Sequence, residues 1–334
     1  DEIRAMALNI YMEQSAVRDG VTAEEVKGIL LGMASGQETL LGYFRRFIRN
    51  FEKRVGINRT VGSLRAYSNA YSHIERFLQA QYKLSDIPFS ALDRSFIDKY
   101  DLYLRTERNL APGTIINLTV QLKTIVGEAI ADGIITASPF MGYEPMRPKH
   151  VQKYLTAEEL HRIMTTPLHR QTLYHVRDMF LFSCFTGIPY GDMRLLTKDN
   201  LCLAEDGIWW IKSARQKTKI EFEIPLLDLP LQILKKYSGT APGDKLLPMY
   251  CNSTLNLYLK EIARICHIDR PLVFHAGRHT YATEITLSHG VPLETVSRML
   301  GHSQIETTQI YAKVTDEKID ADSKALNRKI SERF

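Results

Sequence analysis

Apolar residues recur at intervals of three and four along most of the chain, which is the spacing of one face of an α-helix. In the segment 40–55, Leu41, Phe44, Ile48 and Phe51 follow this spacing, while arginine and lysine occupy the other faces. Three further segments up to residue 132 show the same period, with turn-forming residues between them. We therefore predict a helical block over residues 38–145, with helices at 40–55, 60–80, 93–105 and 114–132.

The first 37 residues also show helical spacing. Ile3, Met6 and Ile10 recur at intervals of three and four, and Thr22 with Glu25 forms a capping box that opens a second helix. Glycines in the stretch 32–36 then interrupt the pattern. From this pattern alone, residues 1–37 are a helical extension that packs on the block that follows.

A new domain begins after the helical block. Two prolines and several cations in the stretch 141–153 predict an extended, exposed segment, of which residues 146–153 are the linker. Thr156 and Glu159 then form a second capping box, which opens a domain covering residues 154–334. Helical spacing in this domain predicts helices at 177–185, 229–237, 254–265, 292–300 and 316–330.

Two segments of this second domain alternate apolar and polar residues. They are 207–213 and 219–226, they are rich in β-branched and aromatic residues, and the turn-like residues 214–218 join them. This pattern predicts strands of a small antiparallel sheet. The expected fold is therefore mainly α with a small antiparallel β-sheet, arranged as a helical domain followed by a mixed α/β domain.

Composition restricts the class of protein without identifying it. The 334 residues are 44% hydrophobic and 24% charged, as in ordinary folded proteins, and the net charge of +5 permits a nucleic-acid partner without demonstrating one. The four cysteines are scattered, and no run of 18 apolar residues is present. We therefore expect a cytoplasmic protein outside the membrane. The chain begins at Asp1, so we expect it to be a fragment of a longer protein.

The residues with the most specific chemistry lie between 275 and 311. His275 and Arg278 are three positions apart, so on a helix they share a face and can donate hydrogen bonds to two oxygens of one phosphate. His302 follows Leu300 and Gly301, and Tyr311 comes nine positions after it. Side chains that bind a phosphate, a second histidine and a tyrosine hydroxyl are together the groups needed for nucleophilic attack on a phosphodiester.

Other interpretations of these residues are simpler. An isolated tyrosine is usually a surface or interface residue, and His279 alone is more typical of a packed, hydrogen-bonded histidine than of a reactant. His275 and His279 have the spacing of metal ligands on a helix. However, Ala276 stands where that metalloprotease motif requires glutamate, so we expect no metal.

The order H-x-x-R-H at 275–279, L-G-H-S at 300–303 and T-x-x-Y at 308–311 resembles the signature of the tyrosine recombinases, or phage-type integrases. The resemblance covers residues 38–330 and is strongest to integrases of conjugative transposons. It implies a helical core-binding (SAM-like) DNA-binding domain at 38–145 and a catalytic domain at 154–334. Residues 1–37 are then the remnant of an arm-binding region, and the tail helix packs on a neighbouring protomer.

The resemblance also implies roles for individual residues. Tyr311 attacks the scissile phosphate and forms a 3′-phosphotyrosyl link, while Arg278, His275 and His302 hold the non-bridging oxygens. Lys217, which resembles the hairpin lysine of the family, donates a proton to the leaving oxygen. No cofactor is implied, and the expected partners are double-stranded DNA carrying recombination sites and further copies of the chain, assembled as a tetramer on two sites.

One position departs from the family pattern. Where the family reads T-G-L-R at the turn after the first long helix of the catalytic domain, this chain has Pro189, although Asp192 matches the usual acidic residue. Arg194 lies roughly 140° around a helix from position 189, so we expect it to point elsewhere. Arg215 lies two residues before Lys217, and in an extended hairpin both project from one face. We therefore expect Arg215 to replace the missing cation.

Two other functions remain open at this point. One is a type IB topoisomerase-like enzyme that nicks and closes DNA with similar residues. The other is a catalytically impaired DNA-binding accessory protein, which the loss of an arginine at Pro189 makes conceivable.

Overall fold

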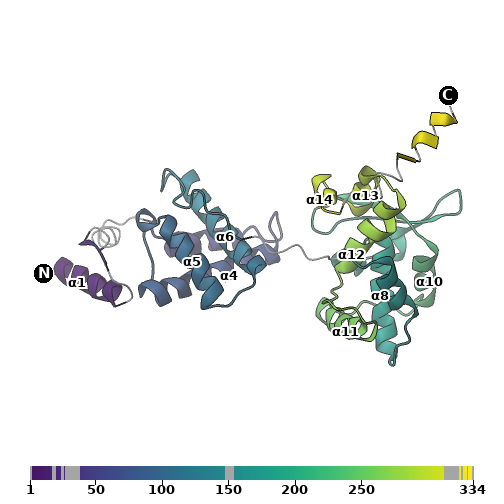
Figure 1. Ribbon diagram of the computed structural model, residues 1–334, viewed down its shortest axis with the longest axis horizontal. Coiled ribbons are helices and arrows are strands. Elements are labelled where there is room, and N and C mark those ends of the chain that lie inside the picture. Colours follow the sequence, from purple (N-terminus) through teal and green to yellow (C-terminus); the bar gives the residue numbers. More distant parts are fainter. Residues whose placement is uncertain are drawn as a thin grey trace. The chain divides into compact units, whose positions relative to one another are not determined.

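The computed structural model describes residues 2–16, 20–23, 26, 38–146, 154–311, 323–324, 326–328 and 330–332. The chain divides into two compact units, Asp1–His150 and Val151–Phe334 (Figure 1). Helices dominate both units, and the second also contains a three-stranded antiparallel sheet. The predicted fold class is therefore confirmed.

The first unit is built on four helices, as the hydrophobic spacing predicts. Their apolar faces form one core, in which Phe44, Phe77, Phe96 and Tyr100 are almost fully buried. A π-helical turn, Leu78–Tyr82, extends the second helix. The four helices are α3 (Leu40–Glu52), α4 (Val61–Phe77), α5 (Arg94–Thr106) and α6 (Pro112–Ala131).

Two polar contacts fix the position of α3. The carboxylate of Asp86 accepts hydrogen bonds from the backbone N–H groups of Leu41 and Gly42, at 2.8 and 3.0 Å, and so caps the start of the helix. The hydroxyl of Tyr43 donates to Asp132 Oδ2 at 2.7 Å, which joins α3 to the end of α6.

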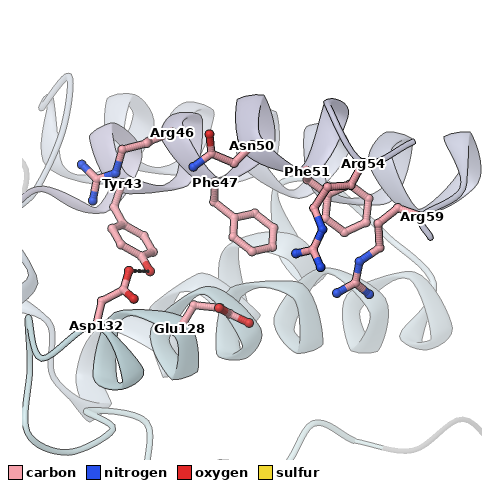
Figure 2. A pocket seen from close by; sticks show the side chains of 9 residues that line it. All are labelled: Tyr43, Arg46, Phe47, Asn50, Phe51, Arg54, Arg59, Glu128 and Asp132. Atoms are coloured by element: carbon pink, nitrogen blue, oxygen red, sulfur yellow. Dashed lines mark hydrogen bonds between the residues drawn. The ribbon is translucent and has the colours of Figure 1, made fainter. Parts of the chain in front are cut away.

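A groove of about 210 Å³ lies between α3 and α6 (Figure 2). Arg46, Arg54 and Arg59 line it on one side, and Glu128 and Asp132 on the other. Both signs of charge therefore face this groove, which distinguishes it from a purely cationic surface.

The described part of the N-terminal segment contacts the rest of the first unit near residues 82–84. Helix α1 (Glu2–Ser15) places Ile10 in a small cluster with Val26 and Leu84. The side-chain amide of Gln14 donates to the carbonyl of Tyr82 at 2.7 Å. Within the described residues, this segment packs on the helical block. Most of the second helix predicted from Thr22 lies outside the described residues.

The second unit is organised around helix α8 (Gln171–Thr186), which packs against α10, α11 and α12. Met179, Phe180 and Phe182 of α8 are fully buried in its core. The surrounding helices are α7 (Ala157–Thr165), α10 (Asp228–Lys236), α11 (Asn252–Ile265) and α12 (Ala276–Thr280). The predicted capping box at Thr156 and Glu159 is present at the start of α7.

The sheet has the strand order β1-β2-β3, and all of its pairs are antiparallel. Strands β2 (Trp209–Ala214) and β3 (Glu221–Pro225) correspond to the predicted hairpin. Strand β1 (Leu201–Leu203) is an addition, since three residues are too few to show alternation in the sequence. Strand β3 packs against helix α13 (Leu293–Leu300), so the hairpin reaches the elements that carry the candidate chemistry.

The described part of the second unit also contains the short α-helices α9 (Tyr190–Met193), α13 (Leu293–Leu300) and α14 (Glu306–Gln309). A π-helical segment, Tyr281–Thr286, and two 3-10 turns, Lys198–Asn200 and Leu287–His289, lie among them. Residues 147–153 of the predicted linker lie outside the described residues, as does most of the predicted tail helix. Of that tail, the described residues from 323 to 331 are helical. Within the described parts of the chain, no helix has the length and apolar character needed to cross a membrane.

Candidate functional site

Arg278 lies at the centre of the candidate site. Its residue surface is only 3% exposed, and its guanidinium is held by protein acceptors. Nη1 donates to the carbonyl of Gly187 at 2.9 Å, and Nη2 donates to the carbonyl of Leu300 at 2.7 Å and to Nε2 of His302 at 2.8 Å. Burial, with a smaller effect from Arg215, lowers the pKa of Arg278 to about 10, so the group stays charged at neutral pH.

Two helix ends supply the carbonyl acceptors. Gly187 caps the end of helix α8; it has a φ of +69° and no room for a side chain, since a Cβ would lie 2.5 Å from the ring of Tyr281. Gly301, with a φ of +63°, caps the end of helix α13, whose last residue is Leu300. Carbonyls at the last turn of a helix have no partner within the helix, and Arg278 donates to these acceptors from outside the two helices.

His302 is held on both ring nitrogens. Nε2 faces the guanidinium of Arg278, and Nδ1 lies 2.7 Å from the hydroxyl of Thr308. A guanidinium can only donate, so Nε2 must accept and the proton of the neutral ring lies on Nδ1. Burial, Arg278 and Arg215, in that order, lower the pKa of His302 to about 4, which is consistent with a neutral ring.

Tyr311 is 8% exposed and lies between two histidine rings. The ring of His302 is parallel to it at a centroid distance of 6.3 Å, and the ring of His279 meets it edge-on at 5.2 Å. Burial raises the pKa of Tyr311, while the charge of Arg278 and a hydrogen bond from it oppose that rise. The phenol therefore lies beside the same guanidinium that holds His302.

Arg215 reaches this cluster from the hairpin. Its Nη1 donates to the carbonyl of Leu300 at 3.1 Å, so Arg215 and Arg278 share one acceptor. Its Nε lies 2.7 Å from Oδ2 of Asp192, which is an ion pair at close range without hydrogen-bond alignment. The other carboxylate oxygen of Asp192 accepts the backbone N–H of Gln216 at 2.8 Å. Asp192 therefore fixes both the side chain of Arg215 and the start of the turn.

The alternation of faces that pairs Arg215 with Lys217 in an extended hairpin is absent, so this part of the prediction is wrong. Strand β2 ends at Ala214, and residues 216–218 form a turn, so the alternation does not continue from Arg215 to Lys217. The turn is closed by hydrogen bonds from Arg215 N to Ile220 O and from Lys219 N to Arg215 O, both 2.8 Å. Lys217 is exposed on this turn and, within the described residues, makes no hydrogen bond or ion pair.

The remaining predicted residues lie around this centre. His275 is the exposed residue before α12, and its ring meets that of His279 edge-on at 4.9 Å. Pro189 is the residue before α9. Arg194 follows α9 and is exposed, which agrees with the expectation that its side chain points away from the site. The structure therefore brings together Arg278, His302, Tyr311 and Arg215, and leaves His275 and Lys217 exposed.

Sequence reasoning did not identify every residue of this cluster. Thr308 is part of the T-x-x-Y motif, but nothing in the motif shows that its hydroxyl binds His302. His279, expected to be a packed histidine, lies between His275 and Tyr311. The carbonyls of Gly187 and Leu300 have no sequence signal beyond the glycine that ends each helix.

The cluster is suited to an anionic substrate. Two guanidiniums and a phenol meet in a site where burial strengthens electrostatic interactions. Such a site stabilises the negative charge that develops on phosphate oxygens when a nucleophile attacks phosphorus. Among the described residues, no group of three or more His, Cys, Asp or Glu side chains is arranged to hold a metal ion.

Comparison with protein families gives two matches. Residues 153–318 match the phage integrase family, and residues 39–145 match the phage integrase SAM-like domain. The chain is 25% identical over 273 residues to the tyrosine recombinase XerD of Listeria monocytogenes, covering 77% of this chain and 89% of that protein. It is 26% identical to XerD of Staphylococcus saprophyticus over 297 residues, which covers 84% of this chain and 96% of the relative.

Solved structures of integrases have the same fold. The Tn1549 transposon integrase in complex with transposon right end DNA matches with a TM-score of 0.67 at 18% identity, over 87% of this chain and 100% of that chain. A lambda integrase tetramer bound to a Holliday junction matches with a TM-score of 0.68 at 16% identity, over 94% of this chain and 87% of that one.

Proposed function

We propose that this chain, which belongs to the phage integrase family of tyrosine recombinases, cuts and rejoins double-stranded DNA through a covalent link to Tyr311. Its relatives are tyrosine recombinases, and the enzyme is a site-specific DNA recombinase. The observation that carries the assignment of Tyr311 is its burial against Arg278 and His302 in one cluster.

In this proposal the hydroxyl oxygen of Tyr311 attacks the scissile phosphorus, and the phenol proton is lost to solvent. A bond forms between phosphorus and the phenol oxygen, and the bond to the 5′ oxygen breaks as that oxygen takes a proton from Lys217, which leaves a 3′-phosphotyrosyl link and a 5′ hydroxyl. Rejoining reverses these steps with a different 5′ hydroxyl, so the link conserves the energy of the broken bond. No cofactor enters the reaction.

Arg278 and Arg215 stabilise the charge that develops on the non-bridging oxygens. Both guanidiniums already meet at the carbonyl of Leu300, so their positions are set before DNA binds. Arg215 thereby supplies the cation that position 189 lacks. Its ion pair with Asp192, the residue of α9 that matches the usual acidic position, supports this assignment.

His302 assists the same oxygens once it is protonated. Two neighbouring guanidiniums and burial lower its pKa to about 4 in the protein without DNA. A phosphate between these groups offsets their positive charge and raises that pKa, because an opposite charge favours the protonated ring. His302 then takes up a proton on Nε2 and donates it as a hydrogen bond.

Lys217 and His275 have roles that depend on bound DNA. Lys217 is the proposed general acid for the leaving 5′ oxygen, and its exposed position on the turn leaves it able to approach a DNA strand. His275, also exposed, is the second proposed histidine donor to the phosphate. We propose further that the enzyme assembles as a tetramer on two DNA sites in the cytoplasm.

The topoisomerase-like and accessory functions gain no support. The matched families and relatives are recombinases, whereas a nicking-closing topoisomerase needs no second DNA site. DNA binding alone does not require a buried tyrosine beside two cations, whereas catalysis by Tyr311 does. Synapsis of two DNA duplexes, measured by mobility shift, separates a recombinase from a nicking-closing enzyme, and a covalent protein–DNA adduct separates it from a non-catalytic protein.

The nucleophile is tested with a duplex nicked so that the strand released by cleavage diffuses away. The expected result is that Tyr311→Phe binds this duplex like the unchanged protein but forms no protein–DNA adduct on a denaturing gel, because only the attacking oxygen is removed. Exposed Tyr250, changed to Phe, is the matched control and should form the adduct normally. An adduct that persists in Tyr311→Phe removes Tyr311 from its role.

A further inference from the structure

Thr308 is buried next to the reacting groups and connects two of them. Its exposed fraction is 0%, and its hydroxyl oxygen lies 2.7 Å from Nδ1 of His302. Its backbone carbonyl accepts the N–H of Tyr311 at 3.0 Å. A single residue therefore contacts both the histidine and the segment that carries the tyrosine.

The direction of the hydrogen bond to Thr308 follows from the other side of the ring. Nη2 of Arg278 faces Nε2 of His302 at 2.8 Å and can only donate. With Nε2 accepting, Nδ1 must carry the proton of the neutral ring and donate it to the hydroxyl oxygen of Thr308. Thr308 thus accepts from the one ring nitrogen that does not face the guanidinium.

We propose that Thr308 is a positioning residue: it holds His302 in the tautomer protonated on Nδ1 and ties the ring to the segment that ends at Tyr311. The inference rests on the proposed function, since it assigns to His302 a role at the scissile phosphate. With Nδ1 already protonated, Nε2 is the only atom of His302 that can take up a further proton. That proton therefore arrives on the side of Arg278 and the phosphate.

Loss of the acceptor on Thr308 leaves the Nδ1–H of the tautomer that Arg278 favours without its partner, and this weakens the preference for that tautomer. The proton then moves between the two nitrogens, although in the other tautomer Nε2–H points at a guanidinium that has no lone pair to accept it. The groups that face His302 are Arg278 from α12, Arg215 from the hairpin and Tyr311 after α14. Arg278 and Arg215 can only donate hydrogen bonds, so neither arginine replaces Thr308 as the acceptor at Nδ1.

The first test measures the tautomer in the full chain without DNA. Histidine labelled with ¹⁵N gives separate ring-nitrogen signals for protonated and unprotonated positions, and a His302→Asn spectrum identifies the signal of His302 among the 10 histidines. We expect a protonated Nδ1 and an unprotonated Nε2 at pH 7. A proton on Nε2 in the unchanged protein overturns the proposal, whatever its variants do.

The second test compares Thr308→Ser, which keeps the hydroxyl, with Thr308→Ala, which differs from Ser by that one oxygen. We expect Ser to keep the single tautomer and near-normal cleavage of the nicked duplex. Ala should give mixed tautomers, cleavage lowered by about tenfold or more, and an altered pH profile of cleavage, since protonation of His302 no longer occurs at one atom. Thr308→Val, which keeps the volume, should match Ala.

Thr307→Val is the control, because Thr307 lies on the same helix with its side chain exposed. It should resemble the unchanged protein in both measurements. Equal cleavage by the Ser and Ala variants with an unchanged tautomer overturns the positioning role. The tautomer is read without any reaction, so a failure of Tyr311 as the nucleophile leaves this part of the test intact.

Discussion

At the scale of single residues, the site is built from donors and acceptors that fit each other before DNA is present. Arg278 and Arg215 both donate to the carbonyl of Leu300, and His302 accepts from Arg278. Two cations held this close repel each other, and the anionic oxygens of a phosphate relieve that repulsion. The two cations therefore interact most favourably with the extra negative charge that phosphate oxygens carry in the transition state of phosphodiester cleavage.

The contribution of Arg215 is tested by comparison with Arg194. We expect Arg215→Ala to lower single-turnover cleavage of the nicked duplex by about 10²-fold or more, the scale of losing one preorganised donor in the transition state. Arg194→Ala, measured at saturating DNA, should have a much smaller effect because its side chain is exposed after α9. The opposite ranking means that the helix, and not the hairpin, supplies the cation.

His302 should also affect stability at acidic pH. Its pKa is about 4 in the folded protein and about 6.5 in an unfolded chain, so the unfolded state binds more protons between these values. The free energy of unfolding should therefore fall as the pH is lowered through this window. Since the ring is partly exposed, we expect a contribution of about 1–3 kcal/mol from this group.

This effect is measured as a difference between proteins. Both tryptophans, Trp209 and Trp210, lie in the second unit, so their fluorescence during urea unfolding reports on the unit that contains His302. The loss of stability from pH 7 to pH 5 should be smaller in His302→Gln than in the unchanged protein. His175, whose pKa is also lowered by burial, is present in both and cancels. Parallel pH curves contradict the assignment of the shift to His302.

The sequence predicted which side chains gather at the candidate site more reliably than it predicted their contacts. His302 and Tyr311 were paired from their spacing, and their rings do lie parallel at 6.3 Å. The alternation that predicts Arg215 at the site is broken by the turn at 216–218, yet Arg215 reaches the site through its contacts with Asp192 and the carbonyl of Leu300. Carbonyl acceptors and side chains brought together by tertiary packing leave no periodic signal in a sequence.

At the scale of elements, close approach between helices positions the site. Helix α12, which carries Arg278, packs against α8 through Gly277. A Cβ at Gly277 would lie 2.9 Å from the hydroxyl of Ser183 and 3.3 Å from the backbone nitrogen of Cys184. Because the backbone of α8 cannot yield locally, the absence of a side chain at this position sets the distance between the two helices.

Gly277→Ala should therefore destabilise the second unit by about 1–3 kcal/mol, the usual cost of overpacking a close contact. Urea unfolding followed by tryptophan fluorescence measures this loss of stability.

Gly127→Ala is the contrasting variant, since Gly127 lies within α6 and a Cβ there would enter open space. It should stabilise the first unit by about 0.5–1 kcal/mol, followed by circular dichroism. Equal effects of both changes argue that the approach of α12 to α8 is not tight.

Elements with a long apolar period were predictable, and short ones were not. The helical block over residues 38–145 follows from spacing alone, because each helix buries one continuous face. Strand β1 has three residues and helix α14 has four, which is less than two alternations or two turns. Their positions depend on the hairpin and on α13, so only the folded chain defines them.

At the scale of the whole molecule, the proposed reaction needs several copies of the chain on DNA. The described residues at the C-terminal end are helical, and Leu326 and Ile330 among them are 59% and 48% exposed. Residues 326 and 330 are four apart, so they share one face of that helix. An exposed apolar face in the described chain is consistent with the tail packing on a neighbouring protomer in the proposed tetramer.

Removal of residues after Lys313 should weaken cooperative assembly on DNA more than binding to a single site. Leu326→Asn combined with Ile330→Asn should have the same effect, since it removes only the shared apolar face. Lys324→Asn with Arg328→Asn changes a different face of the helix and serves as the control. A mobility-shift titration on one-site and two-site duplexes gives both affinities. If the ratio between them is unchanged in the truncated protein and in the apolar variant, the tail folds back on its own chain and the assembly depends on other surfaces.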